Sequence, residues 1–156
     1  MGPSFAHIVQ RVPTETGMAP SALCLEVTES VFLADAPRAL AVLADIKALG
    51  FQAALDDFGT GYPSLAYLRQ LPVDIVKIDR SCTAALPEDK VTAFIVGAIT
   101  GLGHVLDLTV IAEGVETAAE LSALTDVGAD QVQGFHLSHP LPCEEFATYV
   151  SSTTGR

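Results

Sequence analysis

The sequence predicts an α/β fold, namely an incomplete TIM-like (β/α) barrel with about five of the eight strand–helix units of a full barrel. Apolar runs of strand length alternate with helix-periodic runs along the chain. Each strand-like run precedes a helical run, so neighbouring strands are expected to be parallel. A doubly wound sheet would satisfy both observations. Polar side chains near the end of every strand favour the barrel, because a barrel gathers such residues at one mouth.

The expected elements follow in chain order. A helix is expected over residues 5–16, ahead of the first strand, and Gly50 is expected to end the helix that follows that strand. We assign 1–150 to one domain and 151–156 to a disordered tail. The expected strands are 22–29, 51–58, 73–79, 108–115 and 130–135, and the helices after them are 36–50, 63–71, 88–106, 117–128 and 143–149.

Composition narrows the classes of partner. The chain has 156 residues, 49% of them hydrophobic, which is enough for a core and too apolar for a disordered polar tail. Its formal net charge is −11, and its 8 Lys and Arg residues are scattered. We therefore expect neither a nucleic-acid polymer nor a membrane as a partner. Cys24, Cys82 and Cys143 share no zinc-like spacing and are expected to be reduced thiols, which fits a cytoplasmic location.

Charged side chains stand where the strands are expected to end: Glu26, Asp56, Lys77 and Glu113. Each has a structural explanation when taken alone, since a Glu can cap or pair, the Asp56-Asp57 pair can form a turn, and a lysine can extend to solvent. Together they are harder to explain, because burying unpaired carboxylates is costly and one lysine cannot neutralise them. The pattern therefore favours a site for one or two Mg²⁺ or Mn²⁺ ions, which prefer carboxylate oxygen.

Such a site suits hydrolysis of a phosphate ester. Divalent ions lower the pKa of an attacking water and stabilise the charge that develops on the phosphoryl group. Asp56 and Asp57 can each face one ion. Lys77 can orient or deprotonate the water or hold its charge beside it, and Glu113 can be a ligand or a general base.

Five motifs occur in order over almost the whole chain: LEVTES (25–30), DDFGTGYPSL (56–65), VKID (76–79), AEGVET (112–117) and VQGFHLSHPL (132–141). This set resembles that of the EAL-domain cyclic di-GMP phosphodiesterases. The resemblance implies a TIM-like barrel and metal-dependent hydrolysis of cyclic di-GMP to linear pGpG, as part of bacterial second-messenger signalling. It also implies a homodimer or an upstream signalling domain.

The resemblance further implies a role for individual residues. Glu26, Asp56, Asp57 and Glu113 are expected to be metal ligands, and Lys77, Asp57, Glu113 and Gln133 to act in catalysis. Five more residues are expected to support them: Glu29 as an anchor of the loop after the Asp pair, Gly59 and Gly61 as mobile points in that loop, and Asp79 and Glu116 beside the site.

Two family features are absent from the chain. The Glu-Ala-Leu tripeptide that names the family, whose Glu is a metal ligand, does not occur, and the chain contains no asparagine, although the family uses an Asn ligand. Pro63 stands where the family usually has Ser. We expect about three strands of the barrel to be missing, and the isolated chain to be weak or inactive. The alternative is a non-catalytic relic that binds cyclic di-GMP or a protein partner.

Overall fold

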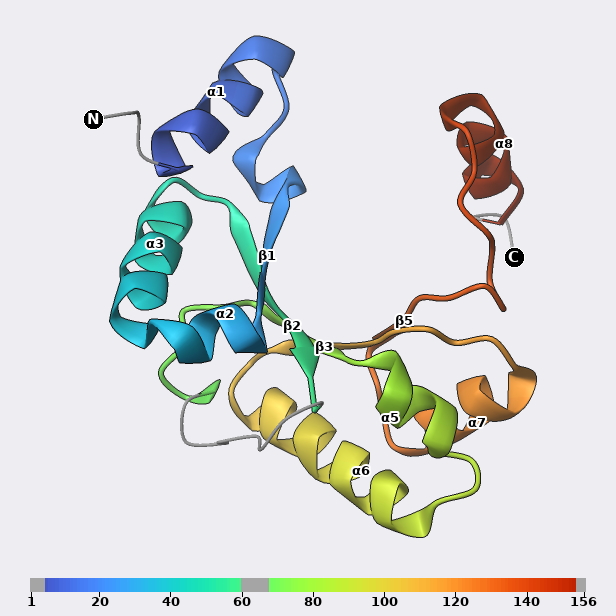
Figure 1. Cartoon of the computed structure of the whole chain (residues 1–156). Coiled ribbons are helices and arrows are strands. Elements are labelled where there is room, and N and C mark those ends of the chain that lie inside the picture. Colours follow the sequence, from blue (N-terminus) through green and yellow to red (C-terminus); the bar gives the residue numbers. More distant parts are fainter. Residues whose placement is uncertain (1–4, 60–67, 154–156) are drawn as a thin grey trace.

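The computed structural model of the chain describes residues 5–59 and 68–153. Among these residues, five strands form one parallel sheet in the order β1-β2-β3-β4-β5. The sheet is open, with β1 and β5 at its edges (Figure 1). The strands are β1 (Cys24–Thr28), β2 (Gln52–Phe58), β3 (Ile75–Ile78), β4 (Thr109–Ala112) and β5 (Gln131–Val132).

The order of the strands decides between the two predicted architectures. A doubly wound sheet reverses its strand order at a switch point, whereas these five strands follow one another without reversal. Right-handed crossovers in one direction place every connecting helix on the same side of the sheet. The strand order is therefore that of a barrel wall, and the prediction of a parallel barrel-type sheet is confirmed.

The helices lie around the strands, except for the last one, which Figure 1 shows apart from the sheet. Among the described residues they are α1 (Phe5–Thr16), α2 (Glu29–Ala34), α3 (Ala36–Ala48), α5 (Arg80–Ala85), α6 (Lys90–Val105), α7 (Ala118–Asp126) and α8 (Cys143–Thr153), with a short 3₁₀ turn at Pro20–Ala22. No helix in this part of the chain is both long enough and apolar enough to cross a bilayer.

The main core fills the layer between the sheet and its helices. Residues at alternate strand positions point into this layer and are fully buried, as the period of two requires. The strand residues of this core are Ala53, Leu55, Val76, Ile78, Val110 and Ala112. The residues between them face the opposite side of the sheet, so Glu26, Asp56 and Lys77 share that side, as the alternation predicted.

The structure differs from the expected elements in three places. The short helices α2 and α5 were not predicted, because each begins directly where a strand ends, capped by the side chains of Thr28 and Asp79. Strands β3, β4 and β5 end earlier than expected. Helix α8 continues to Thr153, so the expected tail is helical over 151–153. The expected helix at 63–71 falls largely outside the described residues.

Candidate active site

The centre of the candidate site is Lys77, which lies among three carboxylates from three other parts of the sheet. Its Nζ is 2.8 Å from Oε1 of Glu26, 3.3 Å from Oδ1 of Asp56 and 2.5 Å from Oε1 of Glu113. The Lys77 side chain is 8% exposed, whereas that of Glu26 is 46% exposed. The structure therefore brings together four of the residues singled out from the sequence, around an ammonium group almost closed to solvent.

The surroundings of Lys77 keep it charged. Burial by itself lowers the pKa of Lys77, but hydrogen bonds to Glu113 and Glu26 and the charges of Glu113 and Asp56 outweigh that effect. The net result is a pKa raised above its usual value. A lysine in this state donates hydrogen bonds and carries charge. It is poorly suited to take a proton from water.

Strand β2 ends in two unusual features, a buried carboxylate oxygen without a partner and a residue with a positive φ. Oδ1 of Asp56 is buried and has no hydrogen-bond partner, because the 3.3 Å approach of Lys77 lacks hydrogen-bond geometry. Asp57 has a φ of 56°, in the left-handed region that non-glycine residues rarely enter. An unsatisfied buried carboxylate oxygen and a strained neighbour are features that cluster at functional sites.

Two of the predicted residues stand just beyond the ends of their strands. Glu113 follows β4, and its amide donates to the Ile78 carbonyl at 3.0 Å. Gln133 follows β5, and its amide donates to the Ala112 carbonyl at 2.9 Å. The side-chain Nε2 of Gln133 donates to Oε1 of Glu113 at 3.1 Å, so the structure joins Gln133 to the Lys77 cluster through Glu113.

Glu29 lies in a different environment from the cluster. It is the first residue of α2 and is 7% exposed, in a small apolar space lined by Phe32, Leu55, Phe58 and neighbouring side chains. Its Oε2 is buried without a hydrogen-bond partner. This position beside the end of β2 is compatible with the expected anchoring of the following loop, whose residues 60–67, including Gly61, lie outside the described residues.

Asp79 caps a helix. Its carboxylate accepts hydrogen bonds from the amide of Ser81 at 2.8 Å and from the Ser81 hydroxyl at 2.5 Å, at the N-terminus of α5. The Ser81 hydroxyl and the backbone amides lower the pKa of Asp79, against a smaller opposing effect of burial. Asp79 thus holds the turn between Lys77 and α5.

Gly59 is the one predicted loop glycine within the described residues. Its φ of 102° is left-handed, and a side chain there would approach Sγ of Cys82 to 3.1 Å. The Cys82 thiol donates a weak hydrogen bond to the Gly59 carbonyl at 3.8 Å. Burial first, and the charge of Asp79 second, raise the pKa of Cys82, which disfavours its reactive thiolate form.

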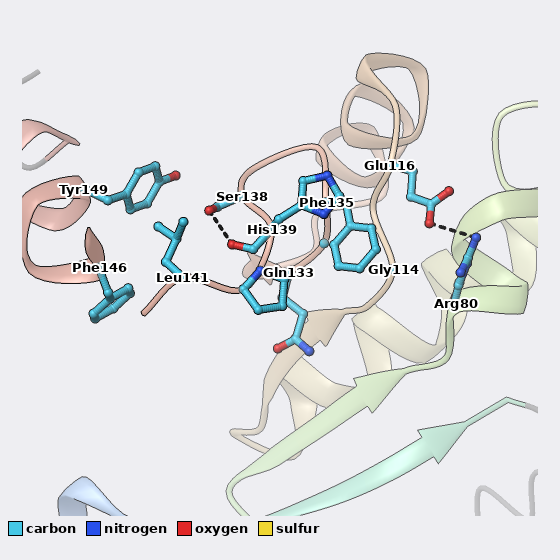
Figure 2. Close-up of a pocket in the computed structure, with 12 residues that line it drawn as sticks. Arg80, Gly114, Glu116, Gln133, Phe135, Ser138, His139, Leu141, Phe146 and Tyr149 are labelled. Carbon is cyan, nitrogen blue, oxygen red and sulfur yellow. Dashed lines mark hydrogen bonds and ion pairs between the residues drawn. The ribbon is translucent and has the colours of Figure 1, made fainter. Parts of the chain in front are cut away.

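Glu116 connects two elements next to the cluster. Its Oε1 pairs with the Arg80 guanidinium at 2.8 Å (Figure 2). Its amide donates to Oε2 of Glu120 at 2.6 Å, and Glu120 also accepts from the Thr117 amide at 3.1 Å, in the capping box that starts α7. Arg80 and Glu120 were not predicted from the sequence. The T-x-x-E spacing of Thr117 and Glu120 is a signal that predicts the latter.

Two glycines that follow these strands permit close packing of the loops. Gly114 has a φ of 68°, and a Cβ there would lie 2.4 Å from Cγ of Arg80. A Cβ on Gly134 would lie 2.2 Å from the Val115 carbonyl oxygen. No side chain fits at either position without movement of its neighbours, so both glycines are required by tertiary contacts. Their only sequence signal is that each comes directly after a polar strand-end residue.

A cavity of about 420 Å³ lies beside the cluster. Figure 2 shows Gln133, Phe135 and His139 between the Arg80–Glu116 pair and the side chains of α8. The rings of Phe135 and His139 are 4.3 Å apart between centroids. Lys77 and its three carboxylates do not line this cavity. A volume of this size, with aromatic walls and a few polar groups, suits a small organic ligand.

The fold and the site together define a class of protein. Parallel barrel strands that end in carboxylates and a lysine are typical of enzymes built on the carboxyl-terminal face of a barrel. A sequence profile of the EAL domain matches residues 1–140, so the chain belongs to the EAL domain family, and the resemblance stated from the motifs is confirmed.

Named relatives share most of this chain. The bifunctional diguanylate cyclase/cyclic di-GMP phosphodiesterase MucR of Pseudomonas aeruginosa is 46% identical over 152 residues, which cover 94% of this chain and 22% of MucR. The cyclic di-GMP phosphodiesterase NbdA of the same organism is 40% identical over 146 residues, 92% of this chain and 19% of NbdA. The chain thus spans about a fifth of each relative's length.

Solved structures agree with the fold. The MucR phosphodiesterase in complex with c-di-GMP superposes with a TM-score of 0.82 at 44% identity, over 88% of this chain and 56% of that one. The EAL domain of Mycobacterium smegmatis DcpA gives 0.86 at 38% identity, over 95% of this chain and 66% of that one. Klebsiella pneumoniae BlrP1 in a manganese/cy-diGMP complex gives 0.84 at 30% identity, over 89% of this chain and 35% of that one. The prediction of a TIM-like fold, here an unclosed five-stranded part, is confirmed.

Proposed function

We propose that this chain carries the catalytic face of a cyclic di-GMP phosphodiesterase, which hydrolyses one phosphodiester bond of cyclic di-GMP to give linear pGpG. The observation that carries the proposal is the contact of Lys77 with three carboxylates at the strand ends, in a chain of the EAL family. The named activities of MucR and NbdA support it.

The excess negative charge of this cluster favours a divalent cation, and we propose Mg²⁺ or Mn²⁺, for which the carboxylates of the described residues would have to turn from Lys77 toward the ion. Three carboxylates against one ammonium leave an excess of negative charge, and the buried Oδ1 of Asp56 has no hydrogen-bond partner. Glu26, Asp56, Asp57 and Glu113 would hold the ion or ions, since hard cations prefer such oxygens. A bound ion supplies Lewis-acid stabilisation of the phosphoryl oxygens and a lower pKa for water. The BlrP1 complex with manganese and cy-diGMP supports this choice.

Lys77, Glu113 and Gln133 have separate roles in the proposed reaction. Lys77 holds a positive charge beside the attacking water and orients it by donating a hydrogen bond. Glu113 accepts the proton of that water, and Gln133 keeps the Glu113 carboxylate aligned through the hydrogen bond at 3.1 Å. The water oxygen bonds to phosphorus as the bond from phosphorus to the leaving ribose oxygen breaks, and that oxygen takes the proton back from Glu113 to become a hydroxyl.

A second candidate function is favoured by a specific observation. Among the side chains at 5–59 and 68–153, no group of three or more His, Cys, Asp or Glu residues is spaced to hold an ion, and Lys77 lies among the carboxylates of the cluster. The sheet is also open at both edges. These features favour a module that binds cyclic di-GMP without hydrolysing it.

One experiment separates the two functions. The purified chain is incubated with cyclic di-GMP and Mg²⁺ or Mn²⁺, and the product is analysed by chromatography, with Glu113→Ala as the control. Formation of pGpG that is lost in the control supports the enzyme. Binding of cyclic di-GMP by calorimetry without any pGpG supports the binding module, and the absence of both contradicts both functions.

We further propose a homodimer in the cytoplasm, linked to an upstream signalling domain. Helix α6 exposes Val91, Phe94 and Ile95, with Phe94 78% exposed, and such side chains favour association. The three free cysteines fit a reducing compartment. Analytical ultracentrifugation of the unaltered chain and of Phe94→Ser tests the dimer, which the substitution is expected to weaken.

A further inference from the structure

We propose that Arg80 is a positioning residue for the reaction above: it holds the turn at 113–117 so that Glu113 stays against Lys77. The inference rests on the proposed function for its catalytic meaning. Arg80 is the first residue of α5, directly after its cap, and Glu113 is the first residue after β4. The two segments leave neighbouring strands of the sheet at the same end.

The aliphatic part of Arg80 covers the backbone of the turn. A Cβ on Gly114 would lie 2.4 Å from Cγ, 2.6 Å from Cβ and 2.8 Å from Cδ of Arg80. Three carbons of one side chain therefore lie over the Cα of the residue that follows Glu113. Gly114 reaches this position with a left-handed φ of 68°, which fixes the direction in which the chain leaves Glu113.

The guanidinium of Arg80 extends the contact to the other end of the turn. It pairs with Glu116 at 2.8 Å, and the Glu116 amide is held by Glu120 at 2.6 Å. Hydrogen bonds from the Glu116 and Thr117 amides lower the pKa of Glu120, and the charge of Arg80 acts in the same direction. Arg80 thus contacts one end of the turn by packing and the other by charge.

The opposite side of the turn is held by the loop after β5. The Val115 amide donates to the Gln133 carbonyl at 3.1 Å, and Gly134 allows the two backbones to touch. Gln133 is also the residue whose side chain bonds Glu113. With Arg80 removed, the turn keeps this side, the β-ladder and the hydrogen bonds to Glu120, but it loses the packing over Gly114 and the ion pair at Glu116. Misplacement by about 1 Å at a reacting group can lower a rate by about 100-fold.

The test compares three variants of the full chain. Arg80→Ala removes both contacts, and Arg80→Lys keeps the aliphatic stem and the charge. As a control, Arg11→Ala removes an Arg–Glu pair of α1 that is somewhat more exposed than the Arg80–Glu116 pair. The measurements are kcat and KM for cyclic di-GMP with Mn²⁺, and amide hydrogen exchange of Glu116 and Thr117 without metal. Circular dichroism checks that each variant is folded.

We expect Arg80→Ala to lower kcat by about 10- to 100-fold with little change in KM, as loss of a residue that orients a ligand or base does. It should also speed exchange at Glu116 and Thr117, while Arg80→Lys restores most of both values and Arg11→Ala alters neither. A raised KM with unchanged kcat would mean that Arg80 binds substrate, and it would overturn the proposal.

Failure of the proposed function is distinguishable from failure of this inference. If the unaltered chain forms no pGpG, hydrolysis is disproved for this chain and the exchange measurement decides the role of Arg80. Faster exchange in Arg80→Ala, reversed in Arg80→Lys, then supports the positioning of the turn. Exchange that is unchanged in Arg80→Ala overturns it, whatever the activity.

Discussion

The two ends of the sheet use acidic side chains in opposite ways. At the amino-terminal end, Asp74 and Asp130 are fully engaged with backbone and side-chain donors. At the carboxyl-terminal end, Glu26, Asp56 and Glu113 crowd around one lysine. The first arrangement stabilises the sheet. The second leaves an excess of negative charge, because three carboxylates share one ammonium group.

The amino-terminal end shows the same bonding pattern twice. The carboxylate of Asp74 accepts from the Ala53 amide at 3.0 Å, while the Asp74 amide donates to the Ala53 carbonyl at 2.9 Å. Asp130 repeats both bonds with Val110, at 2.7 and 3.0 Å. Each Asp therefore joins the start of one strand to the strand before it.

A basic side chain from a helix completes each of these two contacts. Lys47 of α3 lies 2.5 and 2.6 Å from the oxygens of Asp74, and Nε2 of His104 of α6 lies 3.1 Å from both oxygens of Asp130. Each Asp therefore connects a helix, a strand and the start of the next strand: Asp74 connects α3, β2 and β3, and Asp130 connects α6, β4 and β5. The comparison indicates that the acids at the amino-terminal end stabilise the sheet, whereas the three around Lys77 are the ones for which we propose a role in chemistry.

The largest expected effect is on the carboxyl-terminal end. Glu113→Gln removes the proposed base and is expected to lower kcat by about 10²- to 10⁴-fold, the usual contribution of general acid–base catalysis. The free energy of unfolding should stay the same or rise, because one of three crowded carboxylates loses its charge. Steady-state kinetics and urea denaturation measure the two quantities. A large loss of stability in Glu113→Gln would show that Glu113 stabilises the fold, and it would contradict the difference drawn between the two ends of the sheet.

Asp74→Ala is expected to have the opposite profile. It leaves the amide of Ala53, which is completely buried, without its side-chain acceptor, and it leaves Lys47 unpaired. We expect the free energy of unfolding to fall by about 1–3 kcal/mol, the cost of an unsatisfied buried group, with kcat nearly unchanged. A variant that keeps its stability but loses turnover would contradict the assignment of this end to stability.

Asp79 sharpens the comparison, because it is an acid at the carboxyl-terminal end that acts in stability. Its pKa is lowered in the folded chain, chiefly by the Ser81 hydroxyl, so its contribution is present above the unfolded value of about 4 and is lost as pH falls through the folded value. Asp79→Asn keeps a good helix cap that does not titrate. Urea denaturation between about pH 5 and about pH 2 should show a smaller acid-induced loss in the variant. An identical loss would contradict the assigned cause.

The smallest effect on stability and activity is expected for a substitution on α1, away from both ends of the sheet. Arg11 pairs with Glu15 on the surface of α1, with both side chains more than half exposed. Arg11→Gln should change the free energy of unfolding by less than about 0.5 kcal/mol and leave kcat unchanged. Thermal denaturation and the pGpG assay provide the baseline for the other variants. A larger change would show that α1 contributes more to the fold than its exposed pair indicates.

The sequence by itself determined the strands and the side of the sheet on which each polar residue lies. Alternation with a period of two is a local property, so the strand pattern alone is enough to place Glu26, Asp56, Lys77 and Glu113 on one side of the sheet. The ordered motifs added the family, which the EAL profile over residues 1–140 confirms. The expected roles of these residues in metal binding and catalysis stay predictions.

Tertiary structure alone decided how these residues and their neighbours contact one another. That Lys77 stands among the carboxylates and that Arg80 covers Gly114 depends on the register of strands distant in sequence. The bonds of Asp74 and Asp130 also join one strand to the start of the next. Periodicity reports which face a side chain takes. It carries no information on which loop meets which, because those contacts form only when the strands align.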